Sequence, residues 1–314
     1  EAITTSGQLS IRWIESAVNN YLNGLLKTDN EDYVVASDTD SIYVVFDKLV
    51  DMVFKKEQQP SKVISFLDSV ARDKIEPFIN KSYQSLHQYV NSYEQKMQMS
   101  REVIADKGIW TAKKRYILNV WDNEGVKYKE PQLKIMGIEA VKSSTPEPCR
   151  EKIKEGLKII MNGTEKELNT FIQKFREEFM TLPPEEIAYP RSVNGLSKFS
   201  DSNQLFAKGA PIHVKGAILY NHLVKKNKLS NKVPYILEGD KIKFINLKQP
   251  NIYQCSSISF VTSLPKELDF HKIVDYDVQF EKSFIEPLNF ILQKINWLVD
   301  RSYGQQGTLE DFFV

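Results

Sequence analysis

The chain has 314 residues, 41% of them hydrophobic and 26% charged, which is enough for one large or two ordinary domains with real cores. The net charge is only +1, which excludes a uniformly basic nucleic-acid binder, so any contact with nucleic acid has to be local. No apolar run approaches the roughly 18–20 residues of a membrane span. The two cysteines, Cys149 and Cys255, have no zinc-site spacing and indicate a reducing compartment.

The first 137 residues predict helices packed on an antiparallel sheet. Apolar residues at helical spacing predict an amphipathic helix over residues 7–26. The sequence Ser-Asp-Thr-Asp-Ser at 37–41 follows and is flanked by β-prone runs, so it predicts a strand–turn–strand hairpin. After it, a long helix or helix pair is expected at residues 61–93. Strands are expected at 100–105, 113–121 and 126–129, with a turn at 122–125 before the last of them.

The pattern changes after Lys142. Residues 147–180 predict two helices separated near Asn162 and Gly163, and Pro183 and Pro184 end the second helix. Residues 188–210 are rich in Ser, Asn, Lys and Gly and predict a loop. Two short strands, at 234–237 and 241–246, are expected around a tight turn, and mixed helix is expected at 271–299.

The hairpin at 37–41 carries two carboxylates, Asp38 and Asp40. On an extended chain, side chains two residues apart point to the same side. Two converging carboxylates suit Mg²⁺, which prefers oxygen ligands and keeps positions open for phosphate and water. Ser, Asp and Thr also simply make a good hairpin turn.

The surrounding sequence favours the metal-binding interpretation. Residues 33–46 resemble motif C of family B DNA polymerases, usually written Tyr-Gly-Asp-Thr-Asp-Ser and followed by a β-strand. Ala36 and Ser37 stand where the family usually has Tyr-Gly. The rest of the chain resembles, in family order, the C-terminal part of the T-even-type phage replicative polymerases. The supporting segments are 110–116, 118–122, 133–139, 142–146, 212–216, 219–221 and 238–241.

The resemblance implies an α+β fold with three parts. Residues 1–137 are expected to form the C-terminal half of a polymerase palm, an antiparallel sheet with helices. Residues 138–305 are expected to form a mainly helical thumb, and residues 306–314 a peptide that binds the sliding clamp.

The resemblance also implies nucleotidyl transfer assisted by two Mg²⁺ ions. Asp40 is expected to be a direct metal ligand, and Asp38 its catalytic neighbour. Glu102 aligns with an acidic palm strand and is a further candidate ligand, although it also suits a surface strand. The phage family often has Asp-Arg-Glu where this chain has Ser100, Arg101 and Glu102, so one carboxylate is missing.

Basic residues are expected to hold the primer-template. Residues 113–116 resemble the family's primer-strand segment, and strand alternation puts Lys114 and Tyr116 on one face and Lys113 and Arg115 on the other. A solvated strand edge guarded by lysines is the alternative. Further candidates for DNA contact, from the palm-to-thumb junction and a thumb segment, are Lys142, Ser143, Ser144, Thr145, His213 and Lys215.

The first four of these residues, Lys142 to Thr145, also suit a helix N-cap ahead of Pro146.

The C-terminus fits the Gln-x-x-Leu-x-x-Phe-Phe pattern of clamp-binding peptides, through Gln306, Leu309, Phe312 and Phe313. On one helical turn the three apolar side chains form a joint anchor for a partner groove. A tail folded back on its own core is the alternative.

No segment of the chain resembles the exonuclease motifs, the fingers or the other catalytic palm aspartate. We therefore expect a subunit or fragment that is inactive until an N-terminal polymerase polypeptide completes it. Its partners would be that polypeptide, primer-template DNA, dNTP and the sliding clamp, within phage replication machinery in the host cytoplasm and without a membrane. A non-catalytic module that binds duplex DNA and the clamp is the alternative.

Overall fold

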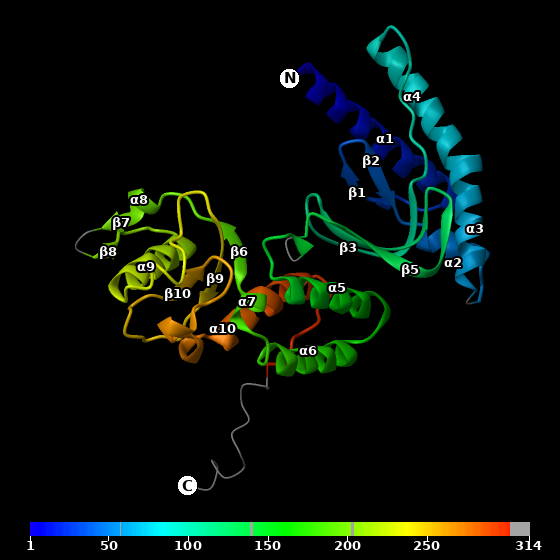
Figure 1. The fold of residues 1–314 in the computed structure, drawn as a ribbon. Coiled ribbons are helices and arrows are strands. Elements are labelled where there is room, and N and C mark those ends of the chain that lie inside the picture. Colours follow the sequence, from blue (N-terminus) through cyan, green and yellow to red (C-terminus); the bar gives the residue numbers. More distant parts are fainter. Residues whose placement is uncertain (57, 139–140, 202–203, 302–314) are drawn as a thin grey trace. The chain divides into compact units, whose positions relative to one another are not determined.

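The computed structural model describes residues 1–56, 58–138, 141–201 and 204–301. The chain divides into two compact units, Glu1–Met136 and Gly137–Val314, which run from blue to green and from green to red in Figure 1. The division lies one residue from the boundary expected after residue 137. Helices are combined with small antiparallel sheets, which confirms the predicted α+β class.

Two long helical runs form the core of unit 1 (Figure 1). Helix α1 (Ala2–Leu26) buries Ile14, Val18 and Leu22, which lie four residues apart on one face. That face packs against a second helical run. The second run consists of α3 (Pro60–Val70), a π-helical turn η1 (Ala71–Ile75) and α4 (Glu76–Val90). The helices predicted at 7–26 and 61–93 are thereby confirmed, whereas α2 (Asp47–Val53) was not predicted.

Unit 1 contains two antiparallel sheets. The predicted hairpin is present as β1 (Val34–Asp38) and β2 (Ser41–Val44). The larger sheet has the order β3-β4-β5, with bounds Val103–Ala112, Arg115–Asn123 and Val126–Met136.

The predicted strand starts at 100 and 113 were too early. Ala112 pairs with Arg115, so the two lysines between them form the β3–β4 turn instead of opening a strand.

Three aromatic rings pack the small hairpin against the larger sheet. Tyr43 on β2 lies with its ring centroid 5.4 Å from that of Trp110 on β3 and 5.2 Å from that of Tyr116 on β4. Tyr116 is buried, and Leu118 and Val120 extend the same apolar face along β4. This stack fixes the hairpin close to the β3–β4 turn.

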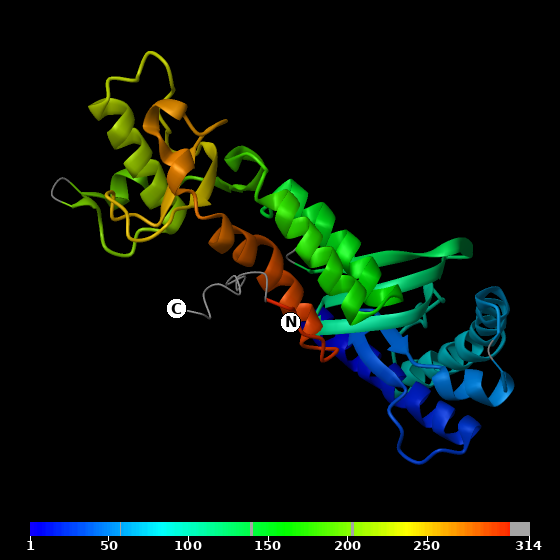
Figure 2. The ribbon, with the colours of Figure 1, turned by 90° about the horizontal axis from the view of Figure 1, so that it is seen from below.

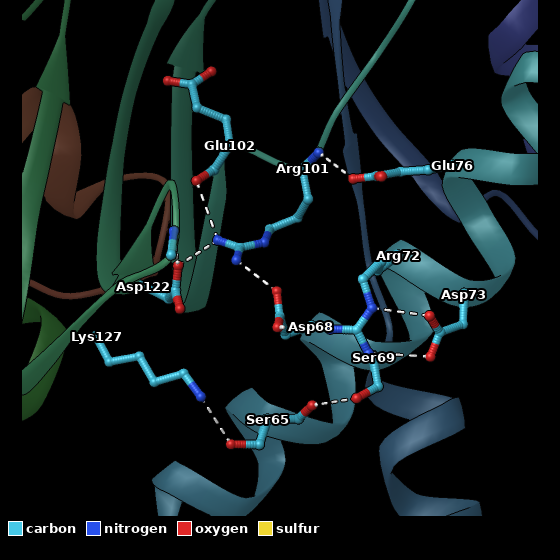
Figure 3. Close-up of polar contacts among 11 residues, drawn as sticks. Ser65, Asp68, Ser69, Arg72, Asp73, Glu76, Arg101, Glu102, Asp122 and Lys127 are labelled. Atoms are coloured by element: carbon cyan, nitrogen blue, oxygen red, sulfur yellow. Dashed lines mark hydrogen bonds and ion pairs between the residues drawn. The ribbon is translucent and has the colours of Figure 1, made fainter.

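A buried ionic network joins the helical run to the beginning of the larger sheet (Figure 3). The guanidinium of Arg101 donates to Asp122 on β4 and to Asp68 on α3, the latter at 2.6 Å. Its backbone amide donates to the Glu76 carboxylate at 2.8 Å. Asp122 is fully buried and also accepts from the Gly125 amide at 2.9 Å. Within the described residues, its second carboxylate oxygen has no hydrogen-bond partner.

Unit 2 begins with the predicted helix pair, α5 (Glu147–Asn162) and α6 (Glu165–Phe179). The start of α6 is fixed by a capping box, in which Thr164 and Glu167 accept hydrogen bonds from each other's backbone amides. Helix α6 ends at Phe179, and Pro184 begins the short α7 (Pro184–Ile187). The break predicted near Asn162 and Gly163 is confirmed, whereas the second helix ends at Phe179, before the two prolines that were expected to end it.

The C-terminal helices pack beside this pair (Figure 2). The run consists of α10 (Tyr276–Phe280), a π-helical turn η5 (Glu281–Ile285) and α11 (Glu286–Leu292). Two 3-10 turns precede it, at Lys266–Leu268 and Phe270–Ile273. Buried phenylalanines fill the contact, with the rings of Phe175 and Phe284 4.7 Å apart. Helix is present as predicted within 271–299.

A second sub-structure of unit 2 places helix α9 (Ile212–Lys226) on a sheet of order β10-β9-β6. These strands are Ser257–Phe260, Lys241–Asn246 and Tyr189–Ser192. Gly216 permits the close approach, because a Cβ there would lie 2.8 Å from the backbone nitrogen of Ser259. Of these elements, only the strand at 241–246 was predicted.

Two predictions for unit 2 were wrong. The segment 188–210 is not a uniform loop, since it holds β6, α8 (Leu196–Phe199) and the pair β7 (Ser200–Asp201) and β8 (Leu205–Phe206). Residues 234–237 form no strand. The Asn221 side chain instead hydrogen-bonds the amide and the carbonyl of Ile236, both at 2.8 Å, and so replaces a strand partner.

Within the described ranges, no helix has both the length and the apolar character needed to cross a membrane.

Candidate active-site hairpins

The two carboxylates of the candidate site lie at the tip of the β1–β2 hairpin. Asp38 pairs with Ser41, so Thr39 and Asp40 form the turn. Thr39 has a φ of 53°, in the left-handed region, and the Asp40 amide donates to the Asp38 carbonyl at 2.6 Å. The chain is therefore not extended between the two acids. The expected convergence by strand alternation was wrong for this reason.

The backbone at Thr39 is strained. A β-branched residue rarely occupies the left-handed region, where the conformational cost for an L-residue is roughly 1–2 kcal/mol. Such outliers persist where the surrounding structure imposes them, and they gather at active sites and ligand clamps. The strained turn thus favours a functional role for this hairpin over a turn chosen only for its propensity.

The β3–β4 turn meets this hairpin through Lys114. Its ammonium nitrogen lies 2.7 Å from Asp38 Oδ1 and donates to the Thr39 hydroxyl at 3.2 Å. The Thr39 hydroxyl in turn donates to Asp38 Oδ1 at 3.1 Å. Lys114 has a φ of 63°, so both turns contain a left-handed residue. Because Lys113 and Lys114 lie in the turn, the alternation of faces predicted for residues 113–116 was wrong for these two.

The two acids have different electrostatic surroundings. The Lys114 ammonium, as hydrogen-bond donor, lowers the pKa of Asp38 below its usual value, and its charge and that of Lys113 add to the effect. The Asp38 side chain is 27% exposed. Asp40 is exposed, and among the described residues its carboxylate makes no ion pair. The site therefore offers one neutralised and one open carboxylate.

Tyr116 lies beneath the hairpin, not on its surface. It is 6% exposed, and its ring contacts Tyr43 and Trp110. Burial, followed by the hydrogen bond with Tyr116, raises the pKa of Tyr43. Tyr116 thus supports the hairpin from inside unit 1, and its contact with DNA stays a prediction. Arg115 begins β4 at the edge of the same turn.

Glu102 is not brought to the two aspartates. It immediately precedes β3, whereas Lys114 follows the other end of that strand, and its carboxylate pairs with Lys134 on β5. In the part of the chain that the structure describes, no three His, Cys, Asp or Glu side chains are grouped to hold a metal ion. A role for Glu102 as a metal ligand therefore stays a prediction without support from this geometry.

The donor set of the hairpin fits a divalent cation as part of a site. Mg²⁺ in phosphoryl-transfer enzymes is commonly held by one or two carboxylates, with substrate phosphates and water completing its shell. The open Asp40 carboxylate matches the first requirement. Asp38 would have to share its charge with Lys114. Two carboxylates are too few for two ions, so further ligands would have to come from outside this hairpin.

The candidate DNA residues of unit 2 lie in two places. Lys142 to Thr145 precede α5, and the Thr145 amide donates to the Lys142 carbonyl at 3.0 Å. Pro146 occupies the N-cap position of α5 and makes no side-chain cap. The alternative interpretation of Lys142, Ser143, Ser144 and Thr145 as an N-cap was therefore wrong, and their contact with duplex backbone stays a prediction.

His213 and Lys215 lie in the first turn of α9. The His213 ring is 5.9 Å from that of Phe244, and burial, followed by the charge of Arg191, lowers its pKa below the usual value. Its carbonyl accepts from Ser259 at 2.7 Å. Lys215 lies over the Phe206 ring at 5.7 Å. These contacts give His213 a packing role, and DNA binding by the two residues stays a prediction.

The clamp-binding pattern at Gln306, Leu309, Phe312 and Phe313 lies outside the described residues. The structure neither supports nor weakens that prediction.

The contact between the two turns was missed by sequence reasoning. Asp38 and Lys114 are 76 residues apart, and nothing in the spacing of either motif indicates the other. The Arg101 network was also missed, although the motif segment at 100–102 contains its central residue.

Comparison with known proteins supports the resemblance. No family model matches the chain. The chain is 38% identical, over 99% of its length, to the DNA-directed DNA polymerase of Escherichia phage RB69. It is 35% identical, over 91% of its length, to that of Enterobacteria phage T4. It spans 35% and 33% of those proteins. The resemblance to these phage DNA polymerases is thus confirmed along nearly the whole chain, which matches about a third of such a polymerase.

Proposed function

We propose that this chain is the part of a DNA-directed DNA polymerase that carries the motif C carboxylates, and that a second polypeptide completes it. The similarity to two phage polymerases over nearly the full chain supports the polymerase part of this proposal. In this view, residues 1–137 are the C-terminal half of a palm and residues 138–305 a thumb.

The observation that carries the proposal is the contact between the acidic and basic turns of unit 1. Asp40 presents an open carboxylate on a strained turn, and Lys114 brings a positive charge within 2.7 Å of Asp38. A metal ion and a primer phosphate need these two kinds of group side by side. A turn selected only for hairpin propensity would have glycine, asparagine or aspartate at the left-handed position that Thr39 occupies, and it would need no cationic neighbour.

Each residue then has a distinct role in nucleotidyl transfer. Asp40 would hold a divalent cation, and Asp38 would fix the position of Lys114. Lys113 and Lys114 would hold primer phosphates, since a lysine is a compact charge suited to phosphate. When bound, two Mg²⁺ ions would lower the pKa of the primer 3′-hydroxyl and stabilise the pyrophosphate leaving group. The packing of Tyr43 on Trp110 and Tyr116 would hold the two turns side by side.

Further parts of the proposal concern the partners. The other catalytic aspartate of the palm, the fingers and the exonuclease would come from an N-terminal polymerase polypeptide, so the chain alone would be inactive. The last nine residues would tether the complex to a sliding clamp. Primer-template DNA and dNTP would be its substrates, and phage replication in the host cell its setting.

A second candidate function is a module that binds duplex DNA and the clamp without catalysis. It is favoured by one observation, the lack of a group of three metal-ligating side chains among the described residues. The two functions differ in their need for Asp40. A module that grips DNA through lysines alone would be sensitive to salt and indifferent to Mg²⁺.

The affinity of the chain for a primer-template tests this difference. We expect Mg²⁺ to tighten binding by the wild-type chain at constant ionic strength, and Asp40→Asn to abolish the Mg²⁺ effect. Asp51→Asn on α2 is a matched control, because it removes an exposed carboxylate of unit 1 outside the hairpin. Binding that ignores both Mg²⁺ and Asp40 would favour the module.

A further inference from the structure

Of the two carboxylates of the hairpin, only Asp38 is paired with Lys114, and the proposed function does not require this difference. A site for divalent cations would ordinarily keep both carboxylates of a pair open to the ion. Here one of the two is already occupied by an ammonium group of the same chain. The other carboxylate, Asp40, is exposed.

We propose that Lys114 is an internal counter-ion that competes with divalent cations for Asp38. The proposal rests on the proposed function, since it concerns the same hairpin and the same cation. It assigns Lys114 a positioning role in the absence of DNA. The hairpin would then bind a cation mainly through Asp40, and weakly.

The geometry supports a specific interaction and not a chance contact. The ammonium of Lys114 engages two atoms of the acidic turn, Asp38 Oδ1 at 2.7 Å and the Thr39 hydroxyl at 3.2 Å. The Thr39 hydroxyl also donates to the same carboxylate oxygen. Two donors, the Lys114 ammonium and the Thr39 hydroxyl, therefore converge on Asp38 Oδ1, the oxygen that a cation would otherwise approach.

The backbone of the basic turn contributes to this arrangement. Lys114 has a φ of 63°, which a residue other than glycine adopts at a cost. Its side chain is 59% exposed, so burial does not hold it against Asp38. The contact with the acidic turn offsets part of the cost of the left-handed conformation. An exposed ammonium on a flexible stem can also leave Asp38 without loss of packing.

Removal of the ammonium should strengthen cation binding. A unit charge about 4 Å from a divalent ion changes its binding by about 30-fold at the dielectric constant of water, and screening by about 0.1 M salt reduces this to about tenfold. The loss of Lys114 would also free Asp38 as a second ligand. The neighbouring Lys113 acts on Asp38 through its charge and not as a hydrogen-bond donor, so its removal should have a smaller effect.

The test uses the full chain and Mg²⁺ as the probe. Threonine methyl groups are labelled with ¹³C, and the Thr39 signal is assigned with Thr39→Ser. The Mg²⁺ concentration at half-maximal shift of this signal reports binding at the hairpin itself. In about 0.1 M salt we expect Lys114→Met to lower that concentration about tenfold, Lys113→Met to change it by about twofold or less, and Asp40→Asn to abolish the titration.

The remaining threonine signals show whether each variant is folded, and Lys114→Gln repeats the experiment with a polar side chain. An unchanged midpoint in both Lys114 variants would overturn the proposal, as would an equal effect of Lys113→Met or a Thr39 signal that ignores Mg²⁺. No polymerase activity is measured, so an inactive complex would contradict the proposed function and leave this result standing.

Discussion

Two ionic clusters lie at opposite ends of strand β3, and they differ in burial. At the beginning of the strand, Arg101 and Asp122 have side chains that are 15% and 0% exposed. At the β3–β4 turn, Lys114 and Asp38 have side chains that are 59% and 27% exposed. A buried ion pair is costly to break, because the remaining charge stays without a partner, whereas a half-exposed pair is readily exchanged for water or another ion.

The backbone does not separate the two clusters. Thr39 and Lys114 are left-handed at the turn end, and Glu124 and Gly125 are left-handed in the β4–β5 turn beside Asp122. The beginning of β3 has the properties of a structural joint because its ion pair is closed to solvent. The turn end has those of a working site because its ion pair is open. Exposure, more than charge or backbone conformation, distinguishes the two.

The largest expected effect is at the buried end. Arg101→Met removes the partner of Asp122 and leaves a buried carboxylate unpaired, so we expect a loss of about 3–5 kcal/mol in the free energy of unfolding. Urea unfolding measures it. Lys127→Met removes a neighbouring exposed contact, to Ser65 at 3.0 Å, and should cost less than about 0.5 kcal/mol. Equal losses in the two variants would remove the distinction.

At the β1–β2 turn, Thr39→Gly should stabilise the chain relative to Thr39→Ala. Glycine adopts the left-handed conformation without the roughly 1–2 kcal/mol cost of a β-branched residue, but it loses more entropy on folding. The expected net gain is up to about 1 kcal/mol in the free energy of unfolding. Thr39→Ala keeps the strain and should give no gain. Both variants lack the Thr39 hydroxyl and its hydrogen bonds, so a Thr39→Gly variant no more stable than Thr39→Ala would mean that the turn is not strained.

Asp38→Asn should have a smaller effect on stability. The Lys114–Asp38 pair is half-exposed, and such pairs contribute roughly 0.2–1 kcal/mol. We expect a loss of under about 1 kcal/mol in urea unfolding, far below that of Arg101→Met. A loss comparable to that of Arg101→Met would show that the hairpin pair is structural.

The smallest effect concerns pH. The pKa of Asp38 is lowered in the folded chain, so the carboxylate contributes stability above the usual value of 3.8 and loses it as the pH falls through the folded pKa. The difference in unfolding free energy between the wild type and Asp38→Asn should therefore persist at pH 5 and 7 and shrink below pH 3.8. A difference that grows on acidification would have the wrong sign.

Sequence patterns predicted the long elements of the fold well. Helical spacing predicted the helices at 7–26, 61–93 and 147–180, because each buries a continuous apolar face. Helix α9 was missed, since it is buried on most sides and shows little periodicity. The strand at 234–237 failed because the Asn221 side chain satisfies the backbone there.

The candidate site was predictable in composition but not in geometry. The resemblance indicated both Asp38 and Lys114, and yet strand alternation gave the wrong reason for their placement. Thr39 and Lys114 lie in two-residue hairpin loops, which require left-handed residues, but the contact between these two turns joins segments that are distant in sequence. Local propensity contains no information about such a contact.

Primer extension tests the central claim most directly. The complex that co-purifies with this chain from its native source is assayed for Mg²⁺-dependent incorporation, with wild-type chain and with Asp40→Asn. We predict incorporation by the wild type and a loss of at least about 100-fold in the variant, which removes the open carboxylate of the site. Equal incorporation by the two complexes would contradict the assignment of the hairpin as a catalytic site.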